Sequence, residues 1–184
     1  MARMLSGWAG MWRRVVGLAI VAAGSMPGAA GAQAAAPEDV STIDGIMGAL
    51  YDVISGPAGE VRDWDRFYAL FLPEGARLIP TGLQQGGATY QVWTPREYAE
   101  RAGPNLEATG FFEREIGRTI EEFGNIAHVF SAYDSKHTLQ DPEPFARGIN
   151  SIQLFHDGSR YWIVTVLWDS ERPGNPIPPR YLGG

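Results

Sequence analysis

Apolar residues recur every three or four positions in three segments of the first half of the chain, a spacing typical of amphipathic helices. The segments cover residues 42–55, 63–71 and 94–108. Gly56, followed by proline, ends the first segment, and Asp63 can cap the second. At the start of the third, Thr94 and Glu97 have the spacing at which both side chains satisfy free backbone N–H groups. We therefore predict three helices.

The second half of the chain changes to a period of two, in which apolar and polar residues alternate as they do in half-buried strands. Long strands are predicted at residues 111–123, 126–136, 147–155 and 161–169, with shorter ones at 76–80 and 88–93. Gly124-Asn125 and Asp157-Gly158 are turn sequences that join long strands into antiparallel hairpins. This order predicts an α+β fold, in which one curved, cone-shaped antiparallel sheet wraps around the three N-terminal helices and encloses a cavity.

Residues 1–32 have a different pattern from the rest of the chain. They contain three arginines and no acidic residue, followed by an apolar run at 15–23 and the small residues Ala30-Gly31-Ala32. These three features together predict a secretory signal peptide, and hence a periplasmic or secreted protein. A transmembrane anchor is the alternative, but it needs about 20 apolar residues. The expected organisation is a signal peptide at 1–32, a flexible leader at 33–40, one domain at 41–172 and a proline-rich tail at 173–184.

The composition of the chain narrows the chemistry. Its 184 residues include no cysteine and three histidines, which excludes disulfides, thiolate metal sites and a cysteine nucleophile. The 15 basic and 21 acidic residues give a net charge of −6, and removal of the three arginines of the signal peptide leaves 12 basic residues and about −9. An acidic chain without a basic stripe is a poor partner for nucleic acid or for an anionic membrane surface.

Three stretches of the sequence resemble those of a known superfamily. They are Asp63-Trp64-Asp65-Arg66-Phe67 in the second helix, Gly124-Asn125-Ile126-Ala127-His128-Val129 in the strands, and Asp157-Gly158-Ser159-Arg160-Tyr161-Trp162-Ile163-Val164 at the last hairpin. Together with the order of elements over about residues 41–170, they are similar to the nuclear transport factor 2-like superfamily, which includes SnoaL-like proteins and ketosteroid isomerases. The chain looks most like exported bacterial members of unknown function. The resemblance implies a cystatin-like α+β barrel with a ligand cavity and no cofactor.

The last hairpin gives the candidate ligand pocket. With Asp157-Gly158 as a two-residue loop, Asn150 and Thr165 face each other on one side of the sheet. The resemblance puts this side toward the helices, where a polar pair among apolar residues is typical of a small-ligand pocket. The alternative is that the two side chains satisfy each other by a hydrogen bond. Trp64 and Tyr68, one turn apart on the second helix, either shape the same pocket or belong to the core.

The same register places four apolar side chains on the other side of the last strand, namely Trp162, Val164, Val166 and Trp168. Such an apolar strip is rare on soluble monomers, and we expect a homodimer to cover it. The alternative cover is the proline-rich tail.

His128 is the one candidate catalytic residue, because a histidine within a strand can act as a general base near neutral pH. A histidine satisfied within the core or an interface is the alternative. The pairs Asp134/His137 and His156/Asp157 provide too few ligands for a metal site, so we expect no metal.

Three functions are compatible with this sequence. The first, which we favour, is an exported domain that binds a small apolar or aromatic molecule in the cone. The second is an isomerase, dehydratase or cyclase that needs no cofactor, and the third is a structural or dimerisation module. A cluster of ionisable side chains in the cone would favour the enzyme. A cone whose only polar groups are Asn150 and Thr165 would favour the binding domain. A cone filled by side chains would favour the structural module.

Overall fold

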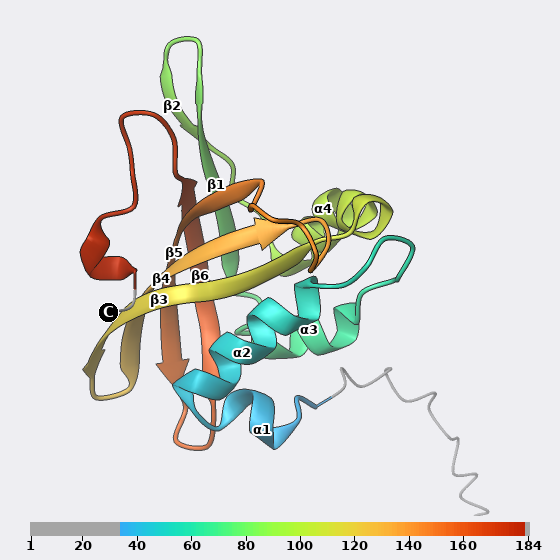
Figure 1. Cartoon of the computed structure of the whole chain (residues 1–184). Coiled ribbons are helices and arrows are strands. Elements are labelled where there is room, and N and C mark those ends of the chain that lie inside the picture. Colours follow the sequence, from blue (N-terminus) through green and yellow to red (C-terminus); the bar gives the residue numbers. More distant parts are fainter. Residues whose placement is uncertain (1–33, 183–184) are drawn as a thin grey trace, which may run out of the picture. The chain divides into compact units, whose positions relative to one another are not determined.

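A computed structural model describes residues 34–182, so the predicted signal peptide lies outside the described part of the chain. The helices are α1 (Pro37–Val40), α2 (Ile43–Ile54), α3 (Trp64–Leu70), α4 (Pro95–Thr109) and the 3-10 helix η1 (Pro179–Tyr181). The strands are β1 (Arg77–Gln84), β2 (Gly87–Tyr90), β3 (Phe112–Phe123), β4 (Ile126–Lys136), β5 (Ala146–His156) and β6 (Tyr161–Ser170). Helices α2, α3 and α4 lie on one face of the curved sheet, as Figure 1 shows. The predicted α+β class is confirmed.

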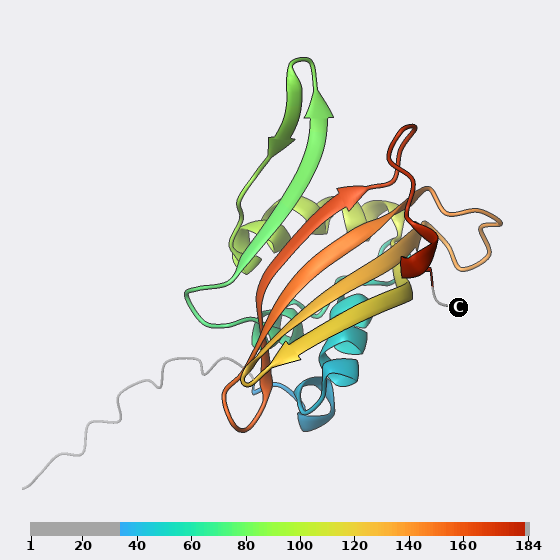
Figure 2. The same cartoon turned by 90° about the vertical axis from the view of Figure 1, so that its left-hand side faces the viewer.

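The six strands form one sheet in the order β2-β1-β6-β5-β4-β3. The four long strands are antiparallel neighbours, whereas β1 runs parallel to β6, with Arg77 paired to Thr165. The two shorter predicted strands, which correspond to β1 and β2, are therefore part of the main sheet. Beyond its contact with β6, the β1–β2 hairpin extends past the rest of the sheet (Figure 2).

Helices α2 and α4 each begin directly after a threonine whose side chain caps the first turn. The Thr42 side chain accepts a hydrogen bond from the backbone N–H of Gly45 at the start of α2. Thr94 and Glu97 form the predicted reciprocal capping box at the start of α4. Part of the segment expected to be a flexible leader forms α1, and Val40 at its end is only 4% exposed because it packs into the core.

The core lies between α2, α3 and the concave face of the sheet. Ile46 of α2 and Phe67 of α3 are fully buried against it. The facing side chains, Val129, Ile152 and Ile163, come from three neighbouring strands and are also fully buried. This packing fills the end of the domain near α1 and α2 and leaves space farther along, between α4 and the sheet.

The hairpin between β5 and β6 has a longer loop than predicted. His156 pairs with Tyr161, so residues 157–160 make a four-residue loop instead of the expected two-residue turn. The Asp157 carboxylate accepts hydrogen bonds from the backbone N–H groups of Ser159 and Arg160, which stabilises this wider turn. The register inferred from a two-residue loop is therefore wrong.

A β-bulge in β6 changes the facing of the residues that follow it. Leu154 pairs with Ile163, but the preceding Gln153 pairs with Thr165, which leaves Val164 as an extra residue. Because side chains alternate along a strand, one extra residue reverses the facing of everything beyond it. After Val164, the side chains that were predicted to point outward face the helices, and those that were predicted to face the helices point outward.

The proline-rich tail folds back onto the outer face of the sheet. Tyr181 of η1 packs on Phe130 of β4, with 4.8 Å between the ring centroids. Ile177 is 7% exposed, and the tail lies across one end of the strands (Figure 2). The tail thus covers Phe130 and leaves most of the outer face open. In the part of the chain that the structure describes, no helix is long and apolar enough to cross a bilayer.

Candidate functional site

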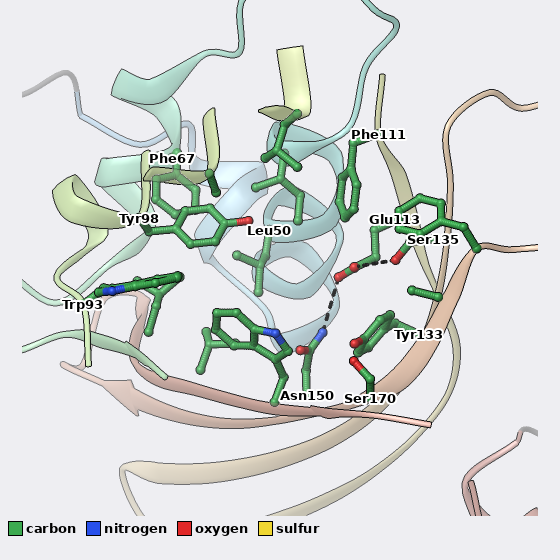
Figure 3. A pocket seen from close by; sticks show the side chains of 18 residues that line it. Leu50, Phe67, Trp93, Tyr98, Phe111, Glu113, Tyr133, Ser135, Asn150 and Ser170 are labelled. Atoms are coloured by element: carbon green, nitrogen blue, oxygen red, sulfur yellow. Dashed lines mark hydrogen bonds between the residues drawn. The ribbon is translucent and has the colours of Figure 1, made fainter. Parts of the chain in front are cut away.

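A cavity of about 350 Å³ lies between α2, α4 and the sheet (Figure 3). Seven of its eighteen lining residues are aromatic, namely Phe67, Trp93, Tyr98, Phe111, Tyr133, Phe145 and Trp168. Its few polar side chains, Glu113, Ser135, Asn150 and Ser170, come from four different strands. An open, mostly aromatic space with a few convergent polar groups is the form that small-molecule sites take.

Among the described residues, Glu113, near the start of β3, is the one charged residue that lines this cavity. Burial among apolar groups raises the pKa of this carboxyl to about 7. Hydrogen bonds from Ser135 (2.8 Å) and from the Asn150 amide (3.4 Å) oppose the rise, and the nearby Asp134 charge adds to it. Glu113 therefore changes charge near neutral pH while it faces the cavity.

A directed hydrogen-bond chain holds Asn150 in place. Ser131 donates its only hydroxyl proton to the Glu115 carboxylate, so Tyr51 must donate to Ser131 Oγ across 2.7 Å. The Tyr51 hydroxyl oxygen can then only accept, and it accepts from Asn150 Nδ2 at 3.1 Å. Glu115 also forms a salt bridge with Arg118. The chain therefore points the Asn150 amide nitrogen toward Tyr51 and Glu113.

Two tyrosine hydroxyls lie near the Glu113 carboxyl. Burial is the main cause that raises the pKa of Tyr133 to about 12, and it raises the pKa of Tyr98 as well. The negative charge of Glu113 raises both further, which places each hydroxyl within electrostatic range of the carboxyl. Both tyrosines thus stay protonated at neutral pH and can donate hydrogen bonds to a ligand.

The structure places Asn150 in the cavity but not Thr165. Asn150 pairs with Trp168 across β5 and β6, because of the longer loop and the bulge. Thr165 pairs with Gln153 and alternates with the cavity-lining Val166, so its side chain points to the outer face. The predicted facing of Asn150 and Thr165 is wrong.

Because of the same bulge, two of the four residues predicted to form a dimer interface lie on the other face of the sheet. Val166 and Trp168 line the cavity instead of the outer face. Trp162 comes before the bulge and Val164 is the bulged residue itself, so the change of facing does not apply to them. Trp162 lies under the Arg160 guanidinium, 3.5 Å from the ring centroid, and donates from Nε1 to Asp157.

Trp64 and Tyr68 do not line the large cavity. Trp64 packs edge-on against Phe67, with ring centroids 5.5 Å apart, and donates a hydrogen bond to Glu107. Tyr68 lies at a shallow surface depression beside α4, where the Arg96 guanidinium sits 4.9 Å from the centre of its ring. Their observed contacts are those of core packing and of a helix–helix contact.

His128 lies away from the cavity. Its Nε2 is 2.9 Å from Ser151 Oγ, and it alternates with the core residues Ala127 and Val129, so it belongs to the outer face. His128 is therefore not among the residues that line the cavity of the candidate site. Within residues 34–182 there is no group of three or more His, Cys, Asp or Glu side chains that could hold a metal ion.

The sequence analysis missed Glu113 and the tyrosines around it. Glu113 reads as one of several exposed acids on an alternating strand, next to Arg114 and close to Glu115. The available signal was the next strand, where Tyr133 and Ser135 share one face and pair with Glu115 and Glu113 of β3. Using that signal required the register of β3 on β4, which a bulge between Glu115 and Gly117 shifts.

Comparison with known proteins gives structural likenesses only. No family model and no curated protein matches the chain. The Kfla4162 protein from Kribbella flavida superposes with a TM-score of 0.53 at 10% identity, over 72% of this chain and 90% of that one. A protein of unknown function with a cystatin-like fold from Nostoc punctiforme PCC 73102 gives 0.51 at 10% identity, over 71% and 89%. An NTF2-like protein of unknown function from Methylobacillus flagellatus KT gives 0.45 at 12% identity, over 71% and 95%.

The first two likenesses show the fold. The chain has a cystatin-like α+β fold, with a curved sheet packed on a few helices. This is the fold that the resemblance to the nuclear transport factor 2-like superfamily predicts, and the prediction is confirmed at that level. A shared fold carries many functions, so the activity has to be argued from the cavity itself.

Proposed function

We propose that this domain binds a small, mostly apolar or aromatic molecule in the cavity between α4 and the sheet, with the ligand's polar group beside Glu113 and Asn150. The observation that carries the proposal is the open space of about 350 Å³ lined by seven aromatic side chains and one carboxyl. An unfilled interior costs packing energy, and a bound molecule would restore the lost contacts. The open interior argues against the structural module, whose cone should be filled.

The binding test uses 2-naphthol, an aromatic probe with one polar group. Trp93 and Trp168 line the cavity, so binding should quench the tryptophan fluorescence. Ala102→Phe on α4 fills the space and should abolish the quenching. Ala88→Phe on β2, at an exposed position outside the cavity, is the matched control and should leave it intact. Equal binding by both variants, with both folded by circular dichroism, would refute the proposal.

A second candidate function is proton transfer on the bound molecule, and the observation that favours it is the Glu113 pKa of about 7. A general base works best when its pKa lies near the working pH. Glu113 is then the base, and the Tyr98 and Tyr133 hydroxyls stabilise charge that develops on the substrate. No cofactor enters this scheme.

The probe for proton transfer is 5-nitrobenzisoxazole. The base takes the ring C–H proton, the electron pair of that bond forms the nitrile, and the N–O bond breaks to release a coloured cyanophenolate. The rate should rise with pH to a plateau, with a midpoint near 7, and Glu113→Gln should remove this pH-dependent part. A rate that is the same for the wild type and Glu113→Gln at every pH excludes Glu113 as a base.

We further propose that the domain acts in the periplasm or outside the cell. The support is the signal-peptide pattern of residues 1–32. The position of the mature N-terminus tests it.

A further inference from the structure

The charge inside the cavity is one-sided. Glu113 is the only acidic residue in its lining, and no lysine, arginine or histidine from the described chain lines it. The carboxyl has no salt-bridge partner there, since its recorded contacts are with the neutral Ser135 and Asn150. The whole chain is acidic as well, with a net charge of −6. A ligand that carries positive charge would supply the missing partner.

Three aromatic rings form a cluster in the same cavity. The ring centroids are 6.4 Å apart for Trp93 and Tyr98, 6.5 Å for Trp93 and Trp168, and 6.3 Å for Tyr98 and Trp168. The rings come from the start of α4 and from β6, so the fold brings them together from distant parts of the sequence. Aromatic rings of this kind pack well against the aromatic or apolar body of a ligand. The Arg101 guanidinium lies 5.8 Å from the Trp93 ring centre and is not part of the cavity lining.

The cavity also offers hydrogen-bond acceptors. The Asn150 amide nitrogen donates to Tyr51 and to Glu113, and Oδ1 has no hydrogen-bond partner within the described residues. Glu113 adds carboxylate oxygens when it is ionised. An ammonium group has three N–H donors and no acceptor, so it matches this arrangement better than a carbonyl or a carboxylate does.

We propose that the ligand of this cavity is an organic cation, an amine with an aromatic or apolar body. Its ammonium group pairs with the Glu113 carboxylate and Asn150 Oδ1, and its body lies against Trp93, Tyr98 and Trp168. The proposal rests on the binding function proposed above and names the class of molecule that is bound.

Cation binding is coupled to proton release. An ammonium group favours the ionised carboxyl, so at pH 6.5 to 7 it displaces the proton that burial keeps on Glu113. Three tyrosines lie near Glu113, namely Tyr51 from α2, Tyr98 from α4 and Tyr133 from β4, and each stays protonated in this range because burial raises its pKa. Asp134 of β4 is paired with Arg114. Glu113 is therefore the source of the released proton.

The test compares three probes of similar size: 2-phenylethylammonium, 2-phenylethanol and phenylacetate. At pH 8, isothermal titration should show the ammonium probe binding about tenfold or more tightly than the alcohol, and phenylacetate most weakly. At pH 6.5, the ammonium heat should depend on the ionisation enthalpy of the buffer, because a proton is released. The alcohol heat should not.

Two variants isolate the carboxyl. Glu113→Gln should lower affinity for the ammonium probe about tenfold and leave the alcohol within about threefold. Glu121→Gln removes a carboxyl from an exposed position of the same strand and should change neither. The buffer dependence in the wild type tests the proposal even if Glu113→Gln does not fold.

Each contrary result has a distinct meaning. Binding of the alcohol as tightly as the ammonium probe, or ammonium binding without proton release, overturns the organic-cation proposal and leaves the binding function standing. If none of the three probes binds while 2-naphthol does, the organic-cation proposal also fails alone. If 2-naphthol does not bind either, both proposals fail.

Discussion

Glu113→Gln should make the protein more stable at alkaline pH and leave it nearly unchanged at acidic pH. The unfolded chain loses the Glu113 proton near the ordinary pKa of 4.5, whereas the folded protein keeps it until about pH 7. Between these values the folded state binds more protons than the unfolded state, so raising the pH favours unfolding. Glutamine carries no charge at any of these pH values and removes this loss.

The size of the effect follows from the two pKa values. Each tenfold change in the acid dissociation constant corresponds to about 1.4 kcal/mol, so the rise from 4.5 to about 7 corresponds to at most about 3.5 kcal/mol. Glu113 keeps some accessible surface in the cavity, where water hydrates its charge, and we therefore expect about 1–3 kcal/mol. At pH 8 the variant should be more stable than the wild type by this amount.

Urea denaturation of both proteins at half-unit steps from pH 4.5 to 8.5 measures the difference. Other carboxyls titrate in both proteins, and their effects cancel when the two free energies of unfolding are subtracted. The difference should grow between pH 4.5 and 7 and then level off. Glu121→Gln should give a flat difference. A flat difference for Glu113→Gln as well would refute the argument that burial raises this pKa.

Four further outcomes are expected. Tyr51→Phe should cost about 1–3 kcal/mol in urea denaturation, because it breaks the buried chain to Ser131; a cost close to zero would contradict the directed chain. The Arg62 guanidinium, between α2 and α3, is buried and donates hydrogen bonds to the backbone carbonyls of Ile54, Gly56, Glu60 and Leu106. Arg62→Lys should lower stability by about 3 kcal/mol or more in urea denaturation, because one ammonium cannot reach all four carbonyls. We expect a homodimer through the open outer face, so Leu167→Glu should give the monomer mass in light scattering, and a monomeric wild type would contradict this. Secreted or periplasmic protein should begin near Gln33 or Ala35 by N-terminal sequencing, and an intact membrane-bound chain would argue against export.

The helices were predictable because each has a local signal. The predicted segments at 42–55, 63–71 and 94–108 agree with α2, α3 and α4 to within one residue at each end. Apolar spacing sets the length of a helix, and side chains close in sequence, such as Thr94 and Glu97, set its start. These interactions need no knowledge of the rest of the fold.

The residues of the cavity were only partly predictable, because their facing depends on distant pairing. Asn150 was identified, although its expected partner Thr165 lies on the other face. One longer loop and one bulge account for that error and for the misplaced Trp168. Glu113 is a site residue because β3 pairs with β4 and because α4 lines the same cavity, and both facts depend on the tertiary fold. Its raised pKa arises mainly from burial by side chains of other elements, and no local pattern encodes it.

The bulge at Val164 gives evolution a simple way to exchange the contents of this cavity. If Val164 became an ordinary paired residue and the bulge were lost, strict alternation along β6 would turn Val166 and Trp168 outward and bring Thr165 and Leu167 inward. The aromatic cluster would lose one ring and the cavity would gain a hydroxyl, with no substitution at any lining position. Relatives with nearly the same sequence in β6 could therefore differ sharply in what they bind, and the pairing register of this strand is the first difference to look for among them.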